Sequence, residues 1–161
     1  MKWEFINHMD KIYALLGELE EKDRENGLER DYPLSWERVH AASCAQIGRL
    51  LAQKRGVDIE LAALACSIHD IGRWYTGRQK DHALYGEEPV RKFLASYSLE
   101  EKDKEEITQA VIHHSEKDMI GSPIEEIVKD ADILDCYLHG DKITKPYHVA
   151  RLEKIMEELG I

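Results

Sequence analysis

The sequence predicts an all-α protein, a single compact bundle of about six to seven helices. Apolar residues recur at helical spacing in nearly every segment of the 161-residue chain, and helix-start signals precede most of these segments. Glycine and proline, 10 and 4 residues, are too few for a many-turned β-sandwich. We therefore expect one domain over residues 1–161, large enough to fold without disulfides or a structural metal.

The first two helices are predicted over residues 3–24 and 35–55. Ser35 is the expected N-cap of the second helix, and Gly56 is the expected residue just beyond its end. One apolar face of the first helix consists of Phe5, Ile6, Met9, Ile12, Tyr13 and Leu16. These patterns predict two amphipathic helices joined by a charged linker.

The segment 59–71 is predicted to be the central helix, since it is apolar on nearly every side. Asp58 is its expected N-cap. Residues 72–81 break the helical period and predict a loop. Asp81 is then expected to cap a fourth helix that continues through Leu94.

Start signals also define the last three helices. Ser98 and Glu101 are expected to open the fifth, and Ser122 and Glu125 to form a capping box before the sixth. The last helix is predicted over 146–159. Its apolar face consists of Leu152, Ile155, Met156 and Leu159. This face would pack on the first helix or mediate formation of a homodimer.

Charge and composition exclude several classes of partner. The chain has 22 basic and 32 acidic residues, a net charge of −10 that argues against a broad nucleic-acid surface. No apolar run approaches the roughly 18 residues of a membrane span, and the first five residues lack the apolar core of a signal peptide. Cys44, Cys66 and Cys136 are odd in number and far apart, which indicates reduced thiols. We expect a cytoplasmic protein without a membrane partner.

Imidazoles and carboxylates occur where core-facing side chains are expected. His40 shares a helix face with Cys44 and Leu51, although a lone histidine there is more often a hydrogen-bonded core residue. His69 and Asp70 end the most apolar helix, where a carboxylate needs a cation, backbone donors or a proton. The alternative to a metal ligand is that Asp70 accepts hydrogen bonds at the start of the loop. That alternative does not explain the adjacent imidazole of His69.

Three more residues extend this set. His114 lies on the face of Ile107 and Val111, Asp132 lies on the apolar side of its helix, and His82 begins a helix, where it would otherwise be a solvated first-turn residue. Together the six form a nitrogen and oxygen donor set suited to Mn, Fe, Ni, Zn or Mg. A ferritin-like di-iron bundle is excluded because it needs two Glu-x-x-His motifs and the chain has one, Glu37 to His40.

The order His40, His69-Asp70, Asp132 on an all-helical chain resembles the HD superfamily of metal-dependent phosphohydrolases. The resemblance covers about residues 35–140 and includes the doublet with its following Gly72 and Arg73. Later segments that resemble the family are His82-Ala83 with Gly86, His114-Ser115, and residues 130–135. The Gly-Tyr-Pro signature of one subfamily is absent, so cyclic-dinucleotide hydrolysis is not inferred.

The resemblance implies a ligand set. One divalent metal in the simplest members is held by two histidines and two aspartates, which correspond here to His40, His69, Asp70 and Asp132. Two-metal members add histidines that correspond to His82 and His114, with Asp70 bridging the ions. His113 is an alternative to His114, and the following Ser115 favours His114. One or two divalent ions are therefore expected.

The resemblance also implies an activity, a divalent-metal phosphohydrolase acting on a small phosphorylated molecule such as a nucleotide. Metal-bound hydroxide would attack phosphorus. Asp70 and Arg73 are the candidate catalytic residues, Asp70 orienting the nucleophile and Arg73 binding phosphate in bidentate fashion. Arg78 and Lys80 in the same loop either attract phosphate or form a solvated surface.

Two alternatives remain open at the level of sequence. HD-fold di-iron oxygenases use four histidines and two aspartates, and a non-enzymatic domain would use its metal structurally. Fold analogy does not decide between them. His8, His139 and His148 match no ligand position and are predicted to lie on the surface.

Overall fold

The computed structural model describes residues 3–161, with side chains described from residue 6, so the predicted role of Phe5 lies outside the described residues. The elements in chain order are α1 (Trp3–Asn26), α2 (Leu34–Arg55), α3 (Ile59–Ile68), α4 (Ile71–Thr76), the 3₁₀ helix η1 (Leu84–Gly86), α5 (Glu87–Leu94), α6 (Glu101–His113), α7 (Pro123–Leu138) and α8 (Pro146–Leu159).

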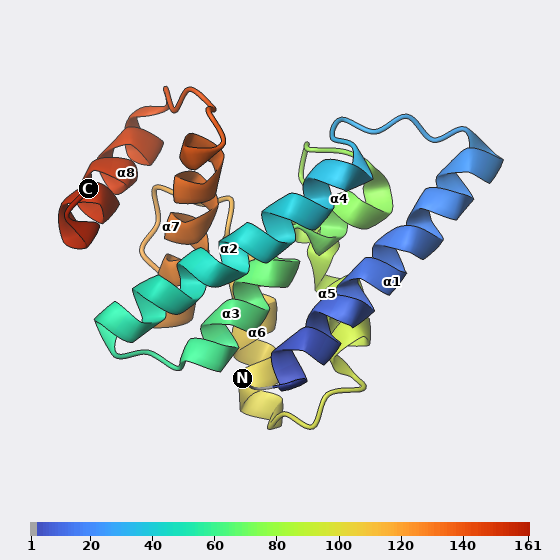
Figure 1. The fold of residues 1–161 in the computed structure, drawn as a ribbon, viewed down its shortest axis with the longest axis horizontal. Coiled ribbons are helices and arrows are strands. Elements are labelled where there is room, and N and C mark those ends of the chain that lie inside the picture. Colours follow the sequence, from blue (N-terminus) through green and yellow to red (C-terminus); the bar gives the residue numbers. More distant parts are fainter. Residues whose placement is uncertain (1–2) are drawn as a thin grey trace.

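The all-α prediction is confirmed. Residues 3–161 contain no strand, and seven of their helices have eight or more residues. Figure 1 shows α2 crossing the centre of the molecule, with α7 and α8 on one side and α1 on the other. No helix of the described chain is long and apolar enough to span a membrane.

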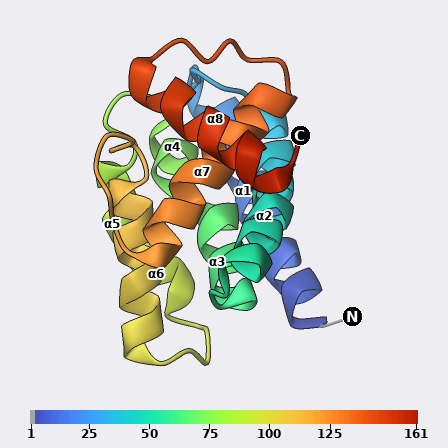
Figure 2. The same ribbon diagram turned by 90° about the vertical axis from the view of Figure 1, so that its left-hand side faces the viewer.

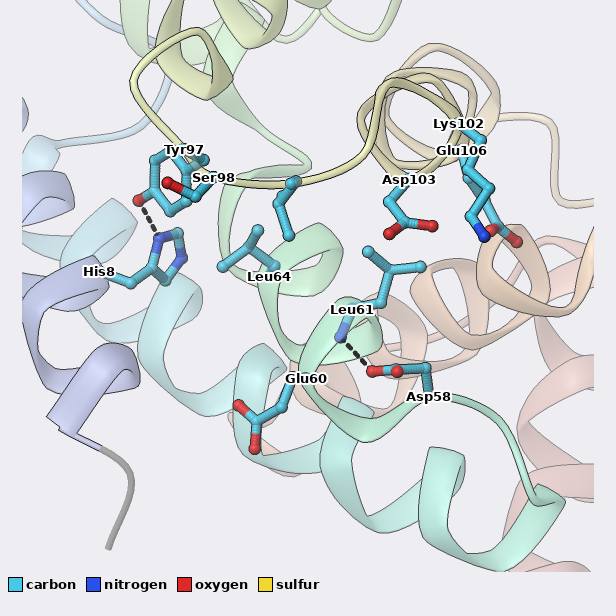
Figure 3. Close-up of a pocket in the computed structure, with 11 residues that line it drawn as sticks. His8, Asp58, Glu60, Leu61, Leu64, Tyr97, Ser98, Lys102, Asp103 and Glu106 are labelled. Atoms are coloured by element: carbon cyan, nitrogen blue, oxygen red, sulfur yellow. Dashed lines mark hydrogen bonds between the residues drawn. The ribbon is translucent and has the colours of Figure 1, made fainter.

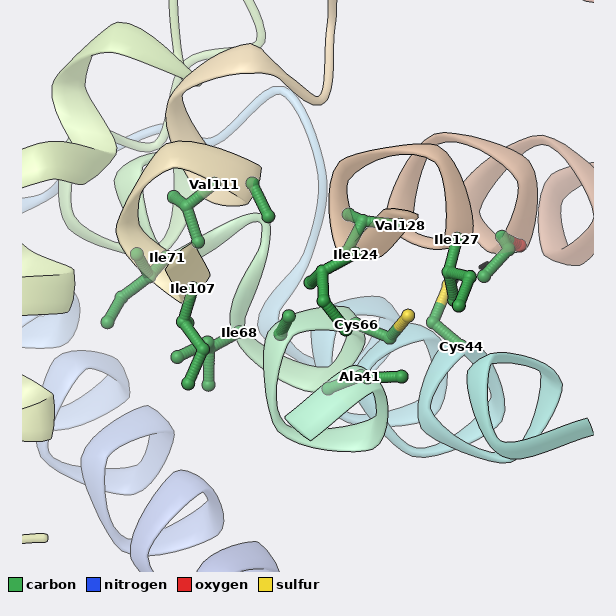
Figure 4. Packing of buried hydrophobic residues seen from close by; sticks show 14 of the residues in the cluster. Ala41, Cys44, Cys66, Ile68, Ile71, Ile107, Val111, Ile124, Ile127 and Val128 are labelled. Atoms are coloured by element: carbon green, nitrogen blue, oxygen red, sulfur yellow. Dashed lines mark hydrogen bonds between the residues drawn. The ribbon is translucent and has the colours of Figure 1, made fainter. Parts of the chain in front are cut away.

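The central helix of the bundle is α3, which packs against α2, α6 and α7. Ala62, Ala65 and Cys66 on this helix are fully buried. Gly48 of α2 faces it so closely that an added Cβ would lie 3.1 Å from the Cβ of Cys66. Small residues at this crossing let two backbones approach, and the isoleucines of α6 and α7 fill the remaining core (Figure 4).

Of the five predicted N-caps, those at Asp58 and Ser122 are confirmed and those at Ser35, Ser98 and Asp81 are wrong. Asp58 accepts a hydrogen bond from the Leu61 amide at 2.9 Å, and Ser122 accepts one from the Glu125 amide at 3.3 Å. Ser35 is not a cap, because α2 already begins at Leu34 after an extended Pro33. Ser98 is not a cap either, because residue 100 precedes α6.

The prediction of an unbroken loop over residues 72–81 is wrong in its first half. The chain turns at His69 and Asp70, and the Asp70 carbonyl then accepts the amides of Arg73 and Trp74 to start α4. Trp74 is 1% exposed, so its burial stabilises this single short helix. Asp81 adopts a left-handed φ of 57° in a turn and does not cap a helix. The fourth predicted helix begins only at Glu87.

The last helix packs on α7 and not, as one alternative had it, on the first helix. Leu152 and Ile155 face α7 and are 8% and 1% exposed. Figure 2 shows α8 lying across α7 on the outside of the bundle. The connection between α7 and α8 lies beside the start of α2, since Lys142 and Lys145 line one pocket together with Trp36 and His40.

His8 is buried, and its prediction as a surface residue is wrong. Its Nε2 lies 2.6 Å from the Ser67 hydroxyl oxygen, and its Nδ1 contacts the Tyr97 hydroxyl beside a cavity of about 780 Å³ (Figure 3). Ser67 donates its proton to the Leu64 carbonyl at 2.7 Å. A serine engaged in this way is a hydrogen-bonded core residue and not a nucleophile activated by His8.

Burial, with a contribution from Lys11, lowers the pKa of His8 to about 4. Below pH 6.5 the unfolded chain therefore binds a proton that the folded chain does not, so stability falls as the pH falls toward 4. Between pH 7.5 and 5 this group is expected to remove about 2 kcal/mol of unfolding free energy. Urea denaturation across that range measures the loss. In His8→Gln the pH slope should be shallower by this amount, and an unchanged slope would contradict the assignment.

Candidate metal centre

Six side chains from widely separated segments converge at one end of the bundle. His40 comes from α2, His69 and Asp70 from the turn between α3 and α4, and Asp132 from α7. His82 lies before η1, and His114 directly follows α6. Five of these residues are at most 5% exposed, and Asp132 has a side chain that is 20% exposed. The structure thus brings together all six predicted ligand candidates.

Four of the donors form one group. The His40 Nε2 lies 3.2 Å from the His69 Nε2, 3.3 Å from Asp70 Oδ2 and 3.4 Å from Asp132 Oδ1. The His69 Nε2 is 3.3 Å from Asp70 Oδ2 and 3.7 Å from Asp132 Oδ1. Ligands that share a metal at about 2.1 Å lie about 3.0–3.4 Å apart, so these atoms have nearly the spacing of one coordination sphere.

The other oxygen of Asp70 belongs to a second group. Its Oδ1 lies 2.9 Å from the His82 Nε2 and 3.5 Å from the His114 Nε2, and these two nitrogens are 2.8 Å apart. His113 points elsewhere, with its Nδ1 3.3 Å from Glu125 Oε2. The geometry therefore selects His114 over His113, and it divides the two Asp70 oxygens between two pairs of imidazoles.

Every imidazole in the cluster has an oxygen acceptor at Nδ1. The Nδ1 atoms of His69, His82 and His114 each lie 2.7 Å from a main-chain carbonyl oxygen, and that of His40 lies 2.6 Å from Asp135 Oδ2. A carbonyl oxygen only accepts, so the proton of each of these rings is at Nδ1. When such a ring is neutral, its Nε2 lone pair points into the cluster, as it does in metal-ligating histidines.

This donor arrangement fits a bound cation. Two Nε2 atoms lie 2.8 Å apart in His82–His114 and 3.2 Å apart in His40–His69, and their lone pairs repel unless a proton or a metal ion lies between them. Imidazole and carboxylate donors without thiolate suit Mn, Fe, Ni, Zn or Mg. Within the described residues the six could hold two ions with Asp70 between them.

The carboxylates of the cluster are held ionised. Burial would raise the pKa of Asp70, but Arg73 and His69 hold it well below its usual value. Burial opposes ionisation of Asp132 as well, and Lys117 is the main cause of its strongly lowered pKa. Burial would lower the pKa of His69, yet the neighbouring carboxylates raise it to about 9. Burial lowers the pKa of His114 to about 4. The cluster therefore offers anionic oxygens to a cation.

Arg73 holds Asp70 through a buried ion-pair network. Its guanidinium donates to Asp70 Oδ2, to Glu37 Oε1 at 2.8 Å and Oε2 at 3.0 Å, and to the Gln79 side chain at 2.6 Å. Glu37 is 1% exposed and also accepts the Trp74 indole N–H at 3.1 Å. These contacts hold the Asp70 carboxylate in place. The bidentate binding of phosphate by Arg73 stays a prediction.

Three residues of the site were not recognised in the sequence as partners of the ligand candidates. Glu37 pairs with Arg73, Asp135 accepts from His40, and the Lys117 Nζ lies 2.6 Å from Asp132 Oδ2. The i, i+3 spacing of Asp132 and Asp135 was an available signal, since it puts both on one helix face. Lys117 lies in the loop after α6 and carried no such signal.

A pocket of about 400 Å³ opens onto the cluster. It is lined by Asp70 and Asp132, by the aromatic side chains of Tyr32 and Trp36, and by cationic or imidazole groups from four segments. The cationic and imidazole groups are His40, Arg73, His82, His114, Lys117, Lys142, Lys145 and His148. His148 was predicted to lie on the surface, and instead it is half-buried in the pocket wall. His139 is exposed, which confirms its surface prediction.

The segment that carries Arg73, Arg78 and Lys80 faces the pocket only in part. Arg78 pairs with Asp31 at 3.1 Å, with side chains 55% and 37% exposed. Lys80 is exposed, and it does not contribute to the pocket wall within the described residues. The positive charge near the cluster comes chiefly from the α6–α7 and α7–α8 connections.

Gly72 lets the His82 segment lie close to the start of α4. A Cβ at position 72 would overlap the His82 carbonyl oxygen and lie 2.7 Å from the Gly86 nitrogen. Gly72→Ala is therefore expected to destabilise the fold by about 1–3 kcal/mol and to displace the His82 imidazole. Urea denaturation and metal-binding stoichiometry measure the two effects. Gly17→Ala in α1, where nothing lies within 4 Å, is the control and should stabilise slightly.

Comparisons with known proteins agree with this geometry. Residues 38–137 match the HD domain. The chain is 34% identical over 113 residues to "Putative phosphohydrolase YueE" of Bacillus subtilis (strain 168), an alignment that covers 60% of this chain and 64% of that protein. No solved structure matches the chain significantly.

Two further relatives are named "Ribonuclease Y". The chain is 32% identical over 122 residues to that of Cutibacterium acnes (strain DSM 16379 / KPA171202) and 30% identical over 120 residues to that of Chlorobium luteolum (strain DSM 273 / BCRC 81028 / 2530). Each alignment covers 73% of this chain and 21% of the relative. The chain thus spans less than two thirds of the length of each of these three relatives. Because the matched segment contains the whole histidine and aspartate cluster, the chain belongs to the HD domain family.

Proposed function

We propose that the chain is a divalent-metal phosphohydrolase that acts on a small phosphorylated molecule at a two-ion site. The observation that carries the proposal is the division of Asp70, whose Oδ2 faces His40 and His69 while its Oδ1 faces His82 and His114. One carboxylate shared between two donor groups is what a bridged pair of ions requires. The name of the Bacillus subtilis relative and the cationic pocket wall support the same class of substrate.

Divalent ions at such a site lower the pKa of a coordinated water and polarise a phosphoryl oxygen. The side chains of this chain would contribute orientation. Arg73 fixes the Asp70 carboxylate, Asp135 fixes the His40 ring, and Lys117 fixes Asp132. Asp132, the most accessible of the six, faces the pocket from which a phosphate ester would enter.

Phosphate release and phosphodiester cleavage test the proposal. Protein loaded in turn with Mn²⁺, Fe²⁺, Ni²⁺, Mg²⁺ or Zn²⁺ is assayed against nucleotides, sugar phosphates and short phosphodiesters, with Asp70→Ala as the blank. We expect turnover of at least one ester with one metal, and none by the blank. Lack of turnover on the whole panel would overturn the proposal.

The same donor set also suits a di-iron oxygenase, which the assay separates. Oxygen uptake by the iron-loaded protein in the presence of an organic phosphate, without phosphate release, would favour the oxygenase. A non-enzymatic metal domain would instead lose its fold on chelation and show neither activity. The printed name of the Bacillus subtilis relative favours the phosphohydrolase over both alternatives.

A further inference from the structure

The pocket beside the cluster has basic side chains at two depths. Arg73 and Lys117 lie at the inner end, and both are engaged by carboxylates of the cluster. Lys142, Lys145 and His148 lie in the outer wall, on the connection between α7 and α8 and the first turn of α8. We call these last three the cationic rim. Among the side chains that the structure describes, those of residues 6–161, neither lysine of the rim forms an ion pair.

The acidic groups of the pocket do not neutralise this rim. Asp70 and Asp132 are held by Arg73 and Lys117, which leaves Asp141 as the other carboxylate in the pocket wall. Two lysines therefore face one aspartate. Burial and the charges of Lys117 and Lys145 lower the pKa of His148, so this ring is a neutral donor in a positive field.

We propose that the cationic rim binds a second anionic group, so that the preferred substrate carries one phosphate at the metal cluster and another phosphate or carboxylate at Lys142 and Lys145. This inference rests on the proposed function, because the reacting phosphate is placed at the cluster. A pocket of about 400 Å³ lies within the ordinary size range of small-molecule sites. Lysine acts there as a point charge for a phosphate oxygen, without the geometric demand of an arginine fork.

Binding of hydrolysis-resistant probes tests the rim independently of turnover. Calorimetry compares propylphosphonate with the terminal diphosphonates of propane, butane and pentane, which differ in the span between two anions. At low salt, at least one diphosphonate is expected to bind the metal-loaded protein about tenfold tighter than propylphosphonate. In Lys142→Gln/Lys145→Gln this advantage should fall to within about twofold, and added salt should reduce it in the wild type.

A charge-matched control separates the rim from the overall charge of the protein. Lys54→Gln/Lys154→Gln removes two exposed lysines outside this pocket, and it should retain the diphosphonate advantage. The proposal is overturned if no diphosphonate binds more tightly than propylphosphonate. It is equally overturned if the advantage survives loss of Lys142 and Lys145, or falls as much in the control.

Turnover distinguishes failure of this inference from failure of the proposed function. Adenosine 3′,5′-bisphosphate and adenosine 5′-monophosphate differ only in the second phosphate, and the wild type should show the higher kcat/KM for the bisphosphate. Lysine-dependent diphosphonate binding without any ester hydrolysis would support the rim and contradict the hydrolase. Hydrolysis with equal kcat/KM and no diphosphonate advantage would support the hydrolase and contradict the rim.

Discussion

Asp70→Asn is expected to reduce the bound divalent metal from two ions to at most one per chain and to abolish most phosphohydrolase activity. The amide keeps the size of the side chain but replaces one of the two anionic oxygens that face the two imidazole pairs. Loss of an outer-sphere partner typically lowers metal affinity or activity 10–100-fold, so loss of a shared ligand should exceed about 100-fold in kcat/KM. Elemental analysis of dialysed protein and steady-state kinetics measure these two effects.

Asp118→Asn is the matched control, since it makes the same change of charge at an exposed residue outside the cluster. It should retain two metal ions and wild-type kcat/KM. Circular dichroism establishes that both variants are folded. Full metal occupancy in Asp70→Asn would contradict the role of Asp70 between two ions, whatever the activity.

Arg73→Met is expected to lower the unfolding free energy of the metal-free protein by about 3–5 kcal/mol, because it leaves the buried carboxylates of Glu37 and Asp70 without their shared cation. Methionine preserves much of the apolar stem, so the loss reports chiefly on charge. Urea denaturation measures it. Divalent metal should restore part of the lost stability, since an ion would neutralise Asp70 again.

Arg78→Met, two residues beyond the end of α4, provides the comparison. The ion pair of Arg78 with Asp31 is exposed, so the urea midpoint should remain close to the wild-type value. An Arg73→Met protein that is as stable as Arg78→Met but has a raised KM for phosphate esters would support the direct phosphate-binding role inferred from sequence. A stability loss confined to Arg73→Met supports positioning of Asp70.

Local sequence patterns predicted the elements well where one helix face decides burial. The last helix at 146–159 follows directly from apolar spacing, and so does the central helix, which was predicted over 59–71 and ends at Ile68. Asp58 and Ser122 are caps whose partners lie three residues away. Residues 72–81 were predicted to form a loop, and the prediction missed α4 because this helix depends on a long-range contact. The burial of Trp74 and the pairing of Arg73 with Glu37, 36 positions earlier, stabilise α4.

The sequence by itself determined the helical class and the six donors of the candidate centre, because apolar periodicity and the order of histidines and aspartates are written along the chain. Tertiary structure decided which oxygen of Asp70 meets which imidazole, that His114 faces the cluster and His113 does not, and that Arg73 is engaged by Glu37. It also decided that Lys142 and Lys145 line the pocket, whereas Arg78 and Lys80 do not. These features depend on helices that meet across the bundle, and spacing along one helix carries no information about the partner it will face.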